Sequence, residues 1–442
     1  MAVVASPASV LDRAVPATRA RLDSIDLLRG IVMVIMVLDH TRDFVHGPAL
    51  HYDPTDLAHS SAAIFMTRWI THFCAPVFVF LAGTSAYLQK MRGKPTGDLS
   101  RFLLTRGIWL IAIEIVILHV LVWFNADFSF IGPLQVIWAL GWCMVVLAGL
   151  IHLPRPAIAT LGIAMIALHN LLDGVRVPAY GLGSPIPGAW EKLWMVLHQA
   201  GFVPLLGASS TLVWVQYPLV PWIGVMAAGY AFGAIYELES DRRVRLLRQA
   251  GVALTLAFVA IRAINIYGDP QRWSTQPTAI FTVLSFMNTT KYPPSLLYLL
   301  MTLGPSLAAL SWFESWPRRA GSAAGGPAGA AGGPAGAAGG PAGATGGPAG
   351  MLVTFGRVPL FFYLIQWPLA HSSAIIANVI AGRPFQYLFS APPAIFNLPW
   401  GTGFRLWVVY VCWAMIILVE YPLCRWFAGV KQRRRDWWLG YL

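Results

Sequence analysis

Ten mostly apolar stretches of about 20 residues each recur along the chain, and they constrain its fold more than any other feature. Each is long enough to cross a bilayer as a helix, because a helix rises about 1.5 Å per residue and the hydrocarbon core is about 30 Å thick. Charged residues make up only 11% of the 442 residues, against about 25% in soluble domains. The sequence therefore predicts an all-α, polytopic transmembrane helical bundle and excludes a disordered chain, a coiled coil and an ordinary soluble enzyme. The expected spans are residues 25–45, 66–89, 102–124, 133–152, 156–172, 217–237, 246–267, 294–313, 351–378 and 404–428.

Positive charges gather in every second connection between these spans. Because cytoplasmic loops carry the excess of Lys and Arg, ten spans with both termini cytoplasmic fit this alternation, and an odd number does not. The net charge of +12 is therefore explained by the topology of the chain. Attraction of the basic loops to anionic lipids at the inner face is sufficient, and binding of nucleic acid is not needed to explain the charge. We expect a protein that is integral to a membrane, namely the bacterial cytoplasmic membrane.

Composition divides the chain into five segments. Residues 320–350 repeat the unit GGPAGAA, whose period of seven excludes a collagen triple helix, and we expect a flexible linker there. The apolar stretch 278–288 is expected to be a re-entrant or interfacial piece, with an eleventh span as the alternative. The remaining segments are a cytoplasmic tail at 1–24, a transmembrane core at 25–319, two last spans at 351–428 and a basic tail at 429–442.

The first span holds ionisable residues, each of which costs about 2.5–3.5 kcal/mol at the centre of a membrane helix. At about 100° per residue, Asp26, Arg29 and His40 share one helix face. Asp26 and Arg29 can neutralise each other near the cytoplasmic end, and His40 lies about 16 Å further along, next to Asp39. The simpler alternative is a structural ion pair with a histidine bonded to a carbonyl. Four ionisable groups on one apolar helix favour a functional site instead.

Two further ionisable groups lie within or at the edge of spans. Glu114 lies in the middle of the third span, so it should face the bundle, paired with Arg262 or Arg106 or bound to substrate. His72 begins the second span on the outer side, at about the level of His40. Both are candidate substrate-binding residues, with a purely structural role as the alternative.

The segment NTTKYPP precedes the eighth span and offers polar groups at its outer end. Its two prolines can start a helix, because their missing N–H groups would have no partner there. Asn288, Lys291 and Tyr292 are candidate substrate-binding residues, with a helix cap and a snorkelling lysine as the alternative. The outer loop 173–216, with Trp190 and Trp194, is a further candidate cover of the substrate site.

The pattern Asp26-x-x-Arg29-Gly30, followed by an apolar run to His40, is similar to the first-helix signature of membrane acyltransferases of the acyltransferase-3 type. Most of the remaining chain resembles a sister family, the heparan-α-glucosaminide N-acetyltransferase catalytic-domain proteins. The segments that carry this resemblance are FVFLAGTSAYL (78–88), RFLLTRGIWLIAIE (101–114), IWALGWCMVVLAGLIHLP (137–154), YPLVPWIGVMAAGYAFG (217–233), NTTKYPPSLLYLLMTLGP (288–305) and FGRVPLFFYLIQWPLAH (355–371).

These resemblances imply transfer of an acyl group, and specifically acetyl, from cytoplasmic acyl-CoA to a hydroxyl or amine of an extracytoplasmic carbohydrate. His40 would act as general base or acyl carrier, with Asp39 orienting or charging its imidazole. Because CoA carries phosphates, Arg29, Arg101 and Arg106 near the inner ends of spans are expected to bind it. Acetyl-CoA is the only cofactor implied, as donor substrate, without any metal. Membrane lipids surround the protein, and a homodimer stays open.

Three alternatives remain open at this point. The catalytic histidine could instead lie in the loop after the first span, which holds His46, His51 and His59. Gln366 stands where the resemblance predicts a histidine, five residues before His371, so the chain could be an inactive relative. A transporter or flippase for a sugar-like or lipid-linked substrate would also use a polar bundle interior. The enzyme hypothesis predicts one water-accessible cavity that joins Arg29 to His40.

Overall fold

A computed structural model describes residues 23–181, 184–205, 211–323, 347–389, 401–434 and 436–441. Within these residues, eight helical segments are long and apolar enough to cross a membrane. The apolar helix α6 has only 15 residues, and α1 has 23 residues with several charges. These two complete the ten expected segments, and the predicted all-α polytopic bundle is confirmed. The ten segments are α1 (Asp23–Val45), α2 to α3 (Ala62–Met91), α4 to α5 (Thr96–Trp123), α6 (Val136–Leu150), α7 with η4 (Arg155–Leu172), α9 with η5 (Leu219–Glu237), α10 (Ser240–Ile264), α12 (Leu296–Ala323), α14 (Pro359–Ile380) and α16 (Leu406–Arg433).

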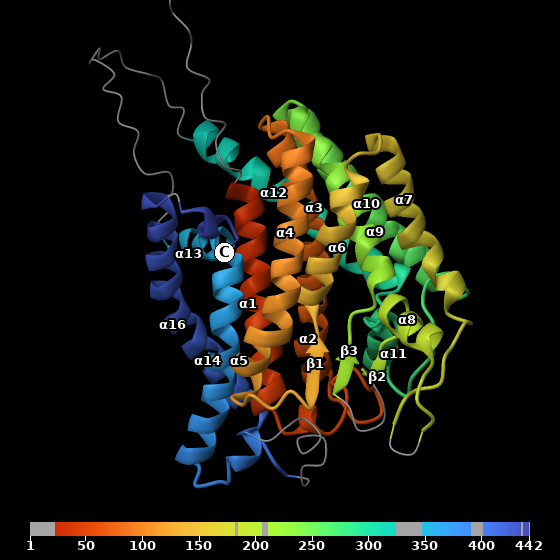
Figure 1. Ribbon diagram of the computed structural model, residues 1–442, viewed down its shortest axis with the longest axis vertical. Coiled ribbons are helices and arrows are strands. Elements are labelled where there is room, and N and C mark those ends of the chain that lie inside the picture. The colour runs from red at the N-terminus through yellow and green to blue at the C-terminus, as the bar shows by residue number, and fades with distance from the viewer. Residues whose placement is uncertain are drawn as a thin grey trace, which may run out of the picture.

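The helices run between two ends of the bundle that differ in chemistry (Figure 1). At one end α1 begins and α16 ends, and the basic connection between α3 (Cys74–Met91) and α4 (Thr96–Ala112) lies there too. At the other end lie the strands. We call these the basic end and the strand end. The rule of positive inner loops predicts that the basic end is cytoplasmic.

Short elements cover the strand end. Strand β3 (Leu212–Val215) lies between β1 (Phe130–Leu134), which is parallel to it, and β2 (Gly201–Pro204), which is antiparallel. The expected re-entrant piece is α11 (Ala279–Met287), whose nine residues are too few to span a bilayer. The other short elements are η1 (Pro48–Leu50), α8 (Ala189–Leu197) and η6 (Gln386–Phe389) at this end, and η7 (Trp437–Gly440) near the C-terminus.

The ninth expected span, residues 351–378, is wrong at its start. The chain forms a separate helix, α13 (Pro348–Arg357), and the span begins only at Pro359. Val358, with φ −129° and ψ 51°, separates the two helices, because a residue before proline disfavours the helical conformation. The predicted linker at 320–350 falls largely on 324–346, which lie outside the described residues.

Helix α13 packs on the start of α1 through two glycines. A Cβ added to Gly30 would lie 1.9 Å from the Leu352 carbonyl oxygen, and one added to Gly356 would lie 1.9 Å from the Asp26 carbonyl oxygen. Only glycine therefore allows this backbone approach. The glycine of the first-helix signature holds α13 against the residues that follow Asp26.

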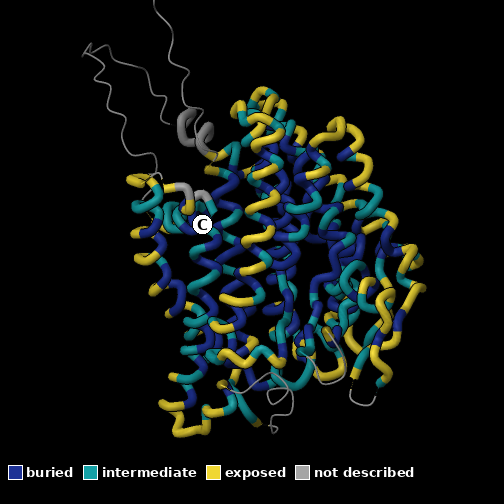
Figure 2. The backbone as a smooth tube through the Cα atoms, viewed as in Figure 1, coloured by how far each residue is buried: buried dark blue, intermediate teal, exposed yellow. Residues whose placement is uncertain are grey.

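Burial separates central from peripheral helices. In the most apolar part of α12, 72% of the residues are buried, against 17% in α10 and 22% in α16. Figure 2 shows the exposed residues on the rim of the bundle and at its ends. Large apolar side chains such as Leu256, Ile264, Leu418 and Trp426 are exposed on this rim, as expected for a surface that faces lipid.

The third span contains a local change of helix type. Between α4 and α5 (His119–Trp123), residues Ile113–Leu118 form a π-helical turn, η3. Such turns are rare and often mark functional sites. Glu114 lies in this turn, and His119 directly follows it.

Candidate active site

Two cavities in the described part of the chain lie toward opposite ends of the same helices. The basic-end cavity has a volume of about 230 Å³, and the strand-end cavity about 250 Å³. Both are lined by parts of the third span, by residues at or near the start of α6, and by α14. Tyr363 of α14 lines both, and no other residue is common to the two linings.

Arg29 lines the basic-end cavity together with Ser85, Gln89 and Arg106. Its guanidinium lies 3.5 Å from the Asp26 carboxylate, as the spacing on the helix predicts. It also donates to the Leu81 carbonyl, at 3.2 Å, and to the Ser85 hydroxyl. The arginine is thus fixed from two helices, and its side chain stays 16% exposed. A partly exposed guanidinium in a cavity is suited to bind an anionic group.

The other two predicted donor-binding arginines differ in position. Arg106 lines the basic-end cavity and lies over the Phe102 ring, 5.8 Å from its centroid. Arg101 is exposed and belongs to neither cavity lining. The structure therefore brings Arg29 and Arg106 together and leaves Arg101 outside, so donor binding by Arg101 is not supported by the geometry.

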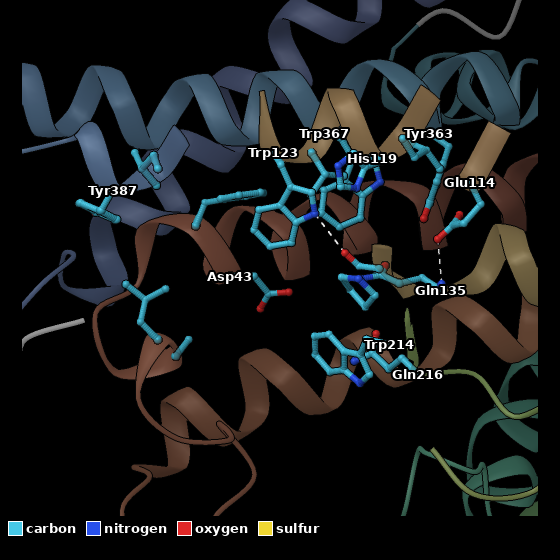
Figure 3. A pocket seen from close by; sticks show the side chains of 18 residues that line it. Asp43, Glu114, His119, Trp123, Gln135, Trp214, Gln216, Tyr363, Trp367 and Tyr387 are labelled. Atoms are coloured by element: carbon cyan, nitrogen blue, oxygen red, sulfur yellow. Dashed lines mark hydrogen bonds between the residues drawn. The ribbon is translucent and has the colours of Figure 1, made fainter. Parts of the chain in front are cut away.

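The strand-end cavity combines aromatic rings with acidic groups (Figure 3). Trp123 comes from α5 and Trp214 from β3, so the small sheet forms part of the wall. The Trp123 indole N–H donates to the Gly132 carbonyl at 3.0 Å, which fixes the ring against β1. Asp43 and Glu114 add two carboxylates. Flat apolar faces with a few polar groups are typical of a small-molecule site.

The predicted pairing of Glu114 with Arg262 or Arg106 is not what the structure has. Glu114 accepts the backbone N–H of Gln135 at 2.8 Å, just before the start of α6. The positive end of that helix dipole replaces the expected arginine. Arg262 donates instead to four backbone carbonyls between Gln271 and Asn288, which fixes the fold around α11. The second carboxylate oxygen of Glu114 has no hydrogen-bond partner among the described residues.

His40 is buried and lines neither cavity. Its ring stacks on Trp367, with centroids 3.8 Å apart, and meets the edge of Tyr363 at 6.1 Å. Both of these aromatic rings line the strand-end cavity. The predicted single cavity joining Arg29 to His40 is therefore wrong for this conformation. Two separate cavities are found in its place. The Trp367 ring lies between His40 and the strand-end cavity.

Asp39 belongs to a buried cluster of charges rather than to His40. Its carboxylate accepts from Arg68 at 2.7 and 2.6 Å and from Arg42, and the Lys291 ammonium lies 3.9 Å away. Arg42 also donates to Asp43 at 2.8 Å. A buried carboxylate with three cationic partners is neutralised by them. The predicted role of Asp39 in orienting the imidazole is thus not supported by the geometry.

The remaining predicted substrate-binding residues lie beside this cluster, outside both cavity linings. His72 is buried and stacks obliquely on Tyr298, whose hydroxyl donates to its carbonyl at 2.7 Å. The Asn288 amide donates to the Thr55 carbonyl at 3.1 Å and so fixes an outer loop. Tyr292 packs edge-on against Tyr217, with centroids 5.1 Å apart. The contacts of His72 match its structural alternative. The helix cap and snorkelling lysine expected as the alternative at NTTKYPP are not found, because Lys291 is buried beside Asp39 and Asn288 bonds to a distant loop.

Sequence reasoning missed several residues of the strand-end cavity. Tyr363, Trp367 and Trp214 could not be singled out, since an aromatic ring in an apolar segment carries no sign of what it faces. Asp43 could have been found, because it lies three and four residues after His40 and Asp39 on one helix. The outer loop does contribute to the cavity, but through Trp214 and Gln216. Trp190 is exposed, and Trp194 bonds to the Val175 carbonyl.

Gln366, which raised the possibility of an inactive relative, and its neighbour His371 are both buried. Gln366 is fully buried, and neither of its amide atoms has a partner among the described residues. The His371 ring bonds to the Val122 carbonyl at 2.7 Å and lies between Phe44 and Phe124. In the described part of the chain, no group of three His, Cys, Asp or Glu side chains could hold a metal ion.

Fold and cavities together define a polytopic helical membrane protein with a cationic cavity toward one end and an acidic, aromatic one toward the other. Residues 21–271 match the family described as heparan-alpha-glucosaminide N-acetyltransferase, catalytic, and the chain belongs to this family. Membership implies an acetyltransferase. The match contains α1 and Glu114 but ends before α14, which holds Tyr363. A search of curated proteins found no match.

Proposed function

We propose that the protein is an integral-membrane acyltransferase. It moves an acyl group, and specifically acetyl, from cytoplasmic acyl-CoA to a hydroxyl or amine of an extracytoplasmic carbohydrate. The single observation that carries this proposal is the pair of cavities, one with guanidinium groups and one with carboxylates, that share Tyr363. The family supports the transfer of an acetyl group.

The donor binds at the basic-end cavity. Arg29 and Arg106 supply charge for the phosphates of CoA, which arginine binds through paired N–H groups. A volume of about 230 Å³ is below the roughly 300–1,000 Å³ of common ligand pockets. The cavity therefore takes the slender acyl-bearing arm of CoA, and the nucleotide stays toward the basic end. In this proposal the thioester lies near Tyr363.

The acceptor binds at the strand-end cavity. The carboxyl groups of Asp43 and Glu114 can accept hydrogen bonds, which suits the hydroxyl and amine donors of a sugar. Trp123 and Trp214 offer flat faces against which a sugar ring can pack. The acceptor's reacting atom then lies on the far side of Tyr363 from the thioester.

In the transfer step the acceptor oxygen or nitrogen attacks the thioester carbonyl carbon, and the bond from carbon to sulfur breaks. The proton of the acceptor passes to a base and then to the CoA sulfur. We assign that base, or an acyl carrier, to His40, which contacts two rings of the strand-end cavity. This role requires Trp367 to turn aside. Glu114 faces the cavity without such a movement.

The test is to incubate the purified protein in detergent with radiolabelled acetyl-CoA and a set of candidate sugars. We expect labelled sugar and equimolar free CoA. His40→Ala should abolish transfer if His40 is the base, and Glu114→Gln should abolish it if the carboxylate is. His72→Ala is the matched control, because this buried histidine lies outside both cavities.

A transporter remains the competing function, because two cavities toward opposite ends would also suit alternating access. Sugar uptake into proteoliposomes without any CoA would establish the transporter and overturn the acyltransferase. CoA release that depends on a sugar would do the reverse. An inactive relative would show neither product nor uptake.

A further inference from the structure

Three chain segments pass from one cavity to the other at the same level of the bundle. In the third span, Leu110 lines the basic-end cavity and Glu114, one turn later, lines the strand-end cavity. At the start of α6, Gln135 lines the strand-end cavity and its neighbour Val136 the basic-end cavity. The two cavities are therefore lined by adjacent parts of the same chain segments.

The layer between the cavities consists of the hydrogen-bonded pair Glu114 and Gln135 on one side and the Tyr363 ring on the other. Glu114 joins the third span to the Gln135 backbone at 2.8 Å, which closes the gap between these two segments. On α14, Leu360 lines the basic-end cavity, and Tyr363 alone lines both. Figure 3 shows Tyr363 beside Glu114 at one end of the strand-end cavity.

Tyr363 is held in this position by packing. Its side chain is only 4% exposed, and it meets the rings of His40 at 6.1 Å and Trp367 at 6.3 Å, both edge-on. A ring packed from these sides resists rotation. It therefore separates the contents of the two cavities.

We propose that the Tyr363 ring is a partition between the donor cavity and the acceptor cavity. It keeps water from the thioester while no acceptor is bound, and it turns aside when the acceptor binds, so that the two reactants meet. The names donor and acceptor rest on the proposed function, whereas the partition rests on the geometry alone. Tyr363 is a positioning residue in this proposal: it sets which nucleophile reaches the acyl carbon.

Loss of the ring has a definite chemical consequence. With the cavities joined, a water molecule from the strand end reaches the acyl carbon. Its oxygen attacks the thioester carbonyl, the carbon–sulfur bond breaks, and acetate and CoA thiol are released. The enzyme then releases CoA without an acceptor. A phenylalanine retains the ring and should retain the partition.

The test that does not depend on activity uses a cysteine in the basic-end cavity. Ala82 lines this cavity on α3, and Ala82→Cys is a small change. A membrane-impermeant thiol reagent is applied to sealed vesicles from the strand-end face. His59→Cys, at an exposed loop position, reports which face the reagent reaches. The chain without either added cysteine corrects for the four native thiols.

We expect Ala82→Cys to be modified at least about tenfold faster in the Tyr363→Ala background than in the Tyr363→Phe background. Tyr363→Leu, which keeps apolar bulk, should give an intermediate rate and guards against an Ala variant that does not fold. Equal modification rates of Ala82→Cys in the Tyr363→Ala, Tyr363→Phe and Tyr363→Leu backgrounds would overturn the proposed partition.

The second readout is the ratio of acceptor-independent CoA release to acetyl transfer. It should rise at least about tenfold in Tyr363→Ala and stay unchanged in Tyr363→Phe. Altered cysteine access with no acetyl-CoA turnover in any variant would support the partition and overturn the proposed function. Unaltered access together with normal acetyl transfer would do the opposite.

Discussion

The two ends of α1 each carry an aspartate and an arginine three residues apart, yet the two pairs have different surroundings. At the basic end, Arg29 lies 3.5 Å from Asp26 and lines a cavity. Toward the strand end, Asp39 and Arg42 are joined by Arg68 and Lys291 in a buried cluster. The first pair lies at the wall of a cavity, whereas the second is enclosed within a buried cluster.

This difference shows why the same spacing supports different roles. A buried group of charges is stable only if each member has a partner, so a closed cluster stabilises the fold and has no capacity for a substrate. A guanidinium that keeps contact with a cavity can still exchange water for a phosphate. Function is therefore expected at Arg29, and stability at Asp39.

The largest expected effect tests the closed cluster. Asp39→Asn leaves Arg42, Arg68 and Lys291 buried without their shared carboxylate, which should lower the free energy of unfolding by about 3–5 kcal/mol. Titration with a denaturing detergent measures the loss. Asp43→Asn is the control and should cost less, because that side chain is 46% exposed. A stability within about 1 kcal/mol of the parent would show that the cluster is not structural.

The next effect tests the open end of α1. Arg29→Gln should reduce kcat/KM for acetyl-CoA about 10- to 100-fold, because a hydrogen bond to a charged group contributes about 1.5–3 kcal/mol. The loss should appear mainly in KM. Arg101→Gln is the matched control, since that arginine is exposed outside both cavities, and its kinetics should not change. Equal losses in both variants would mean that the cavity does not bind the donor.

A third prediction concerns the packing that supports Arg29. Gly30→Ala places a methyl group 1.9 Å from the Leu352 carbonyl oxygen, so α13 must move away from α1. We expect a loss of about 1–3 kcal/mol in stability, together with weaker donor binding. Gly97→Ala is the control, since no atom lies within 4 Å of its added Cβ. If the two variants unfold alike, the glycine contact does not support the first-helix signature.

The smallest effect lies at the exposed strand-end loop. A hydrogen bond from His59, at 2.7 Å, lowers the pKa of Asp56. A carboxyl with a lowered pKa stabilises the fold above its unfolded pKa of about 3.9, and this contribution is lost as the pH falls through the folded value. His59→Ala should therefore cost less than about 1 kcal/mol at neutral pH and nothing at strongly acidic pH. Parallel unfolding curves at pH 7 and pH 3 test this sign, and a larger effect at pH 3 would contradict it.

The spans could be predicted because bilayer thickness sets their length and composition. Ten apolar stretches correspond to the ten helical segments, and the main error, at residues 351–358, follows from Pro359. The pairing of Asp26 with Arg29 was also predictable, since both lie on one helix and its geometry fixes their distance. Arg106 reached the same cavity because it lies near the same end of its span.

Contacts between distant segments could not be predicted in the same way. Helical angles gave the direction of His40 but not what covers it, and Trp367 comes from the other end of the chain. Asp39 forms ion pairs with Arg68 and Lys291, which lie on two other segments of the chain. Tyr363 carried no signal, because a tyrosine in an apolar run looks the same whether it faces lipid, core or a cavity.

The π-helical turn η3 changes the direction in which side chains of the outer half of the third span point. A π-helical turn holds one more residue per hydrogen-bonded loop than an α-helix does. The side chains after Leu118 are therefore rotated about the helix axis by about 100° relative to an unbroken α-helix. Glu114 and His119, which an α-helix would point in different directions, therefore both face the strand-end cavity. Deleting a single residue from Ile113–Leu118 would keep the span but rotate its outer half, so that His119 and Trp123 would turn away from the strand-end cavity.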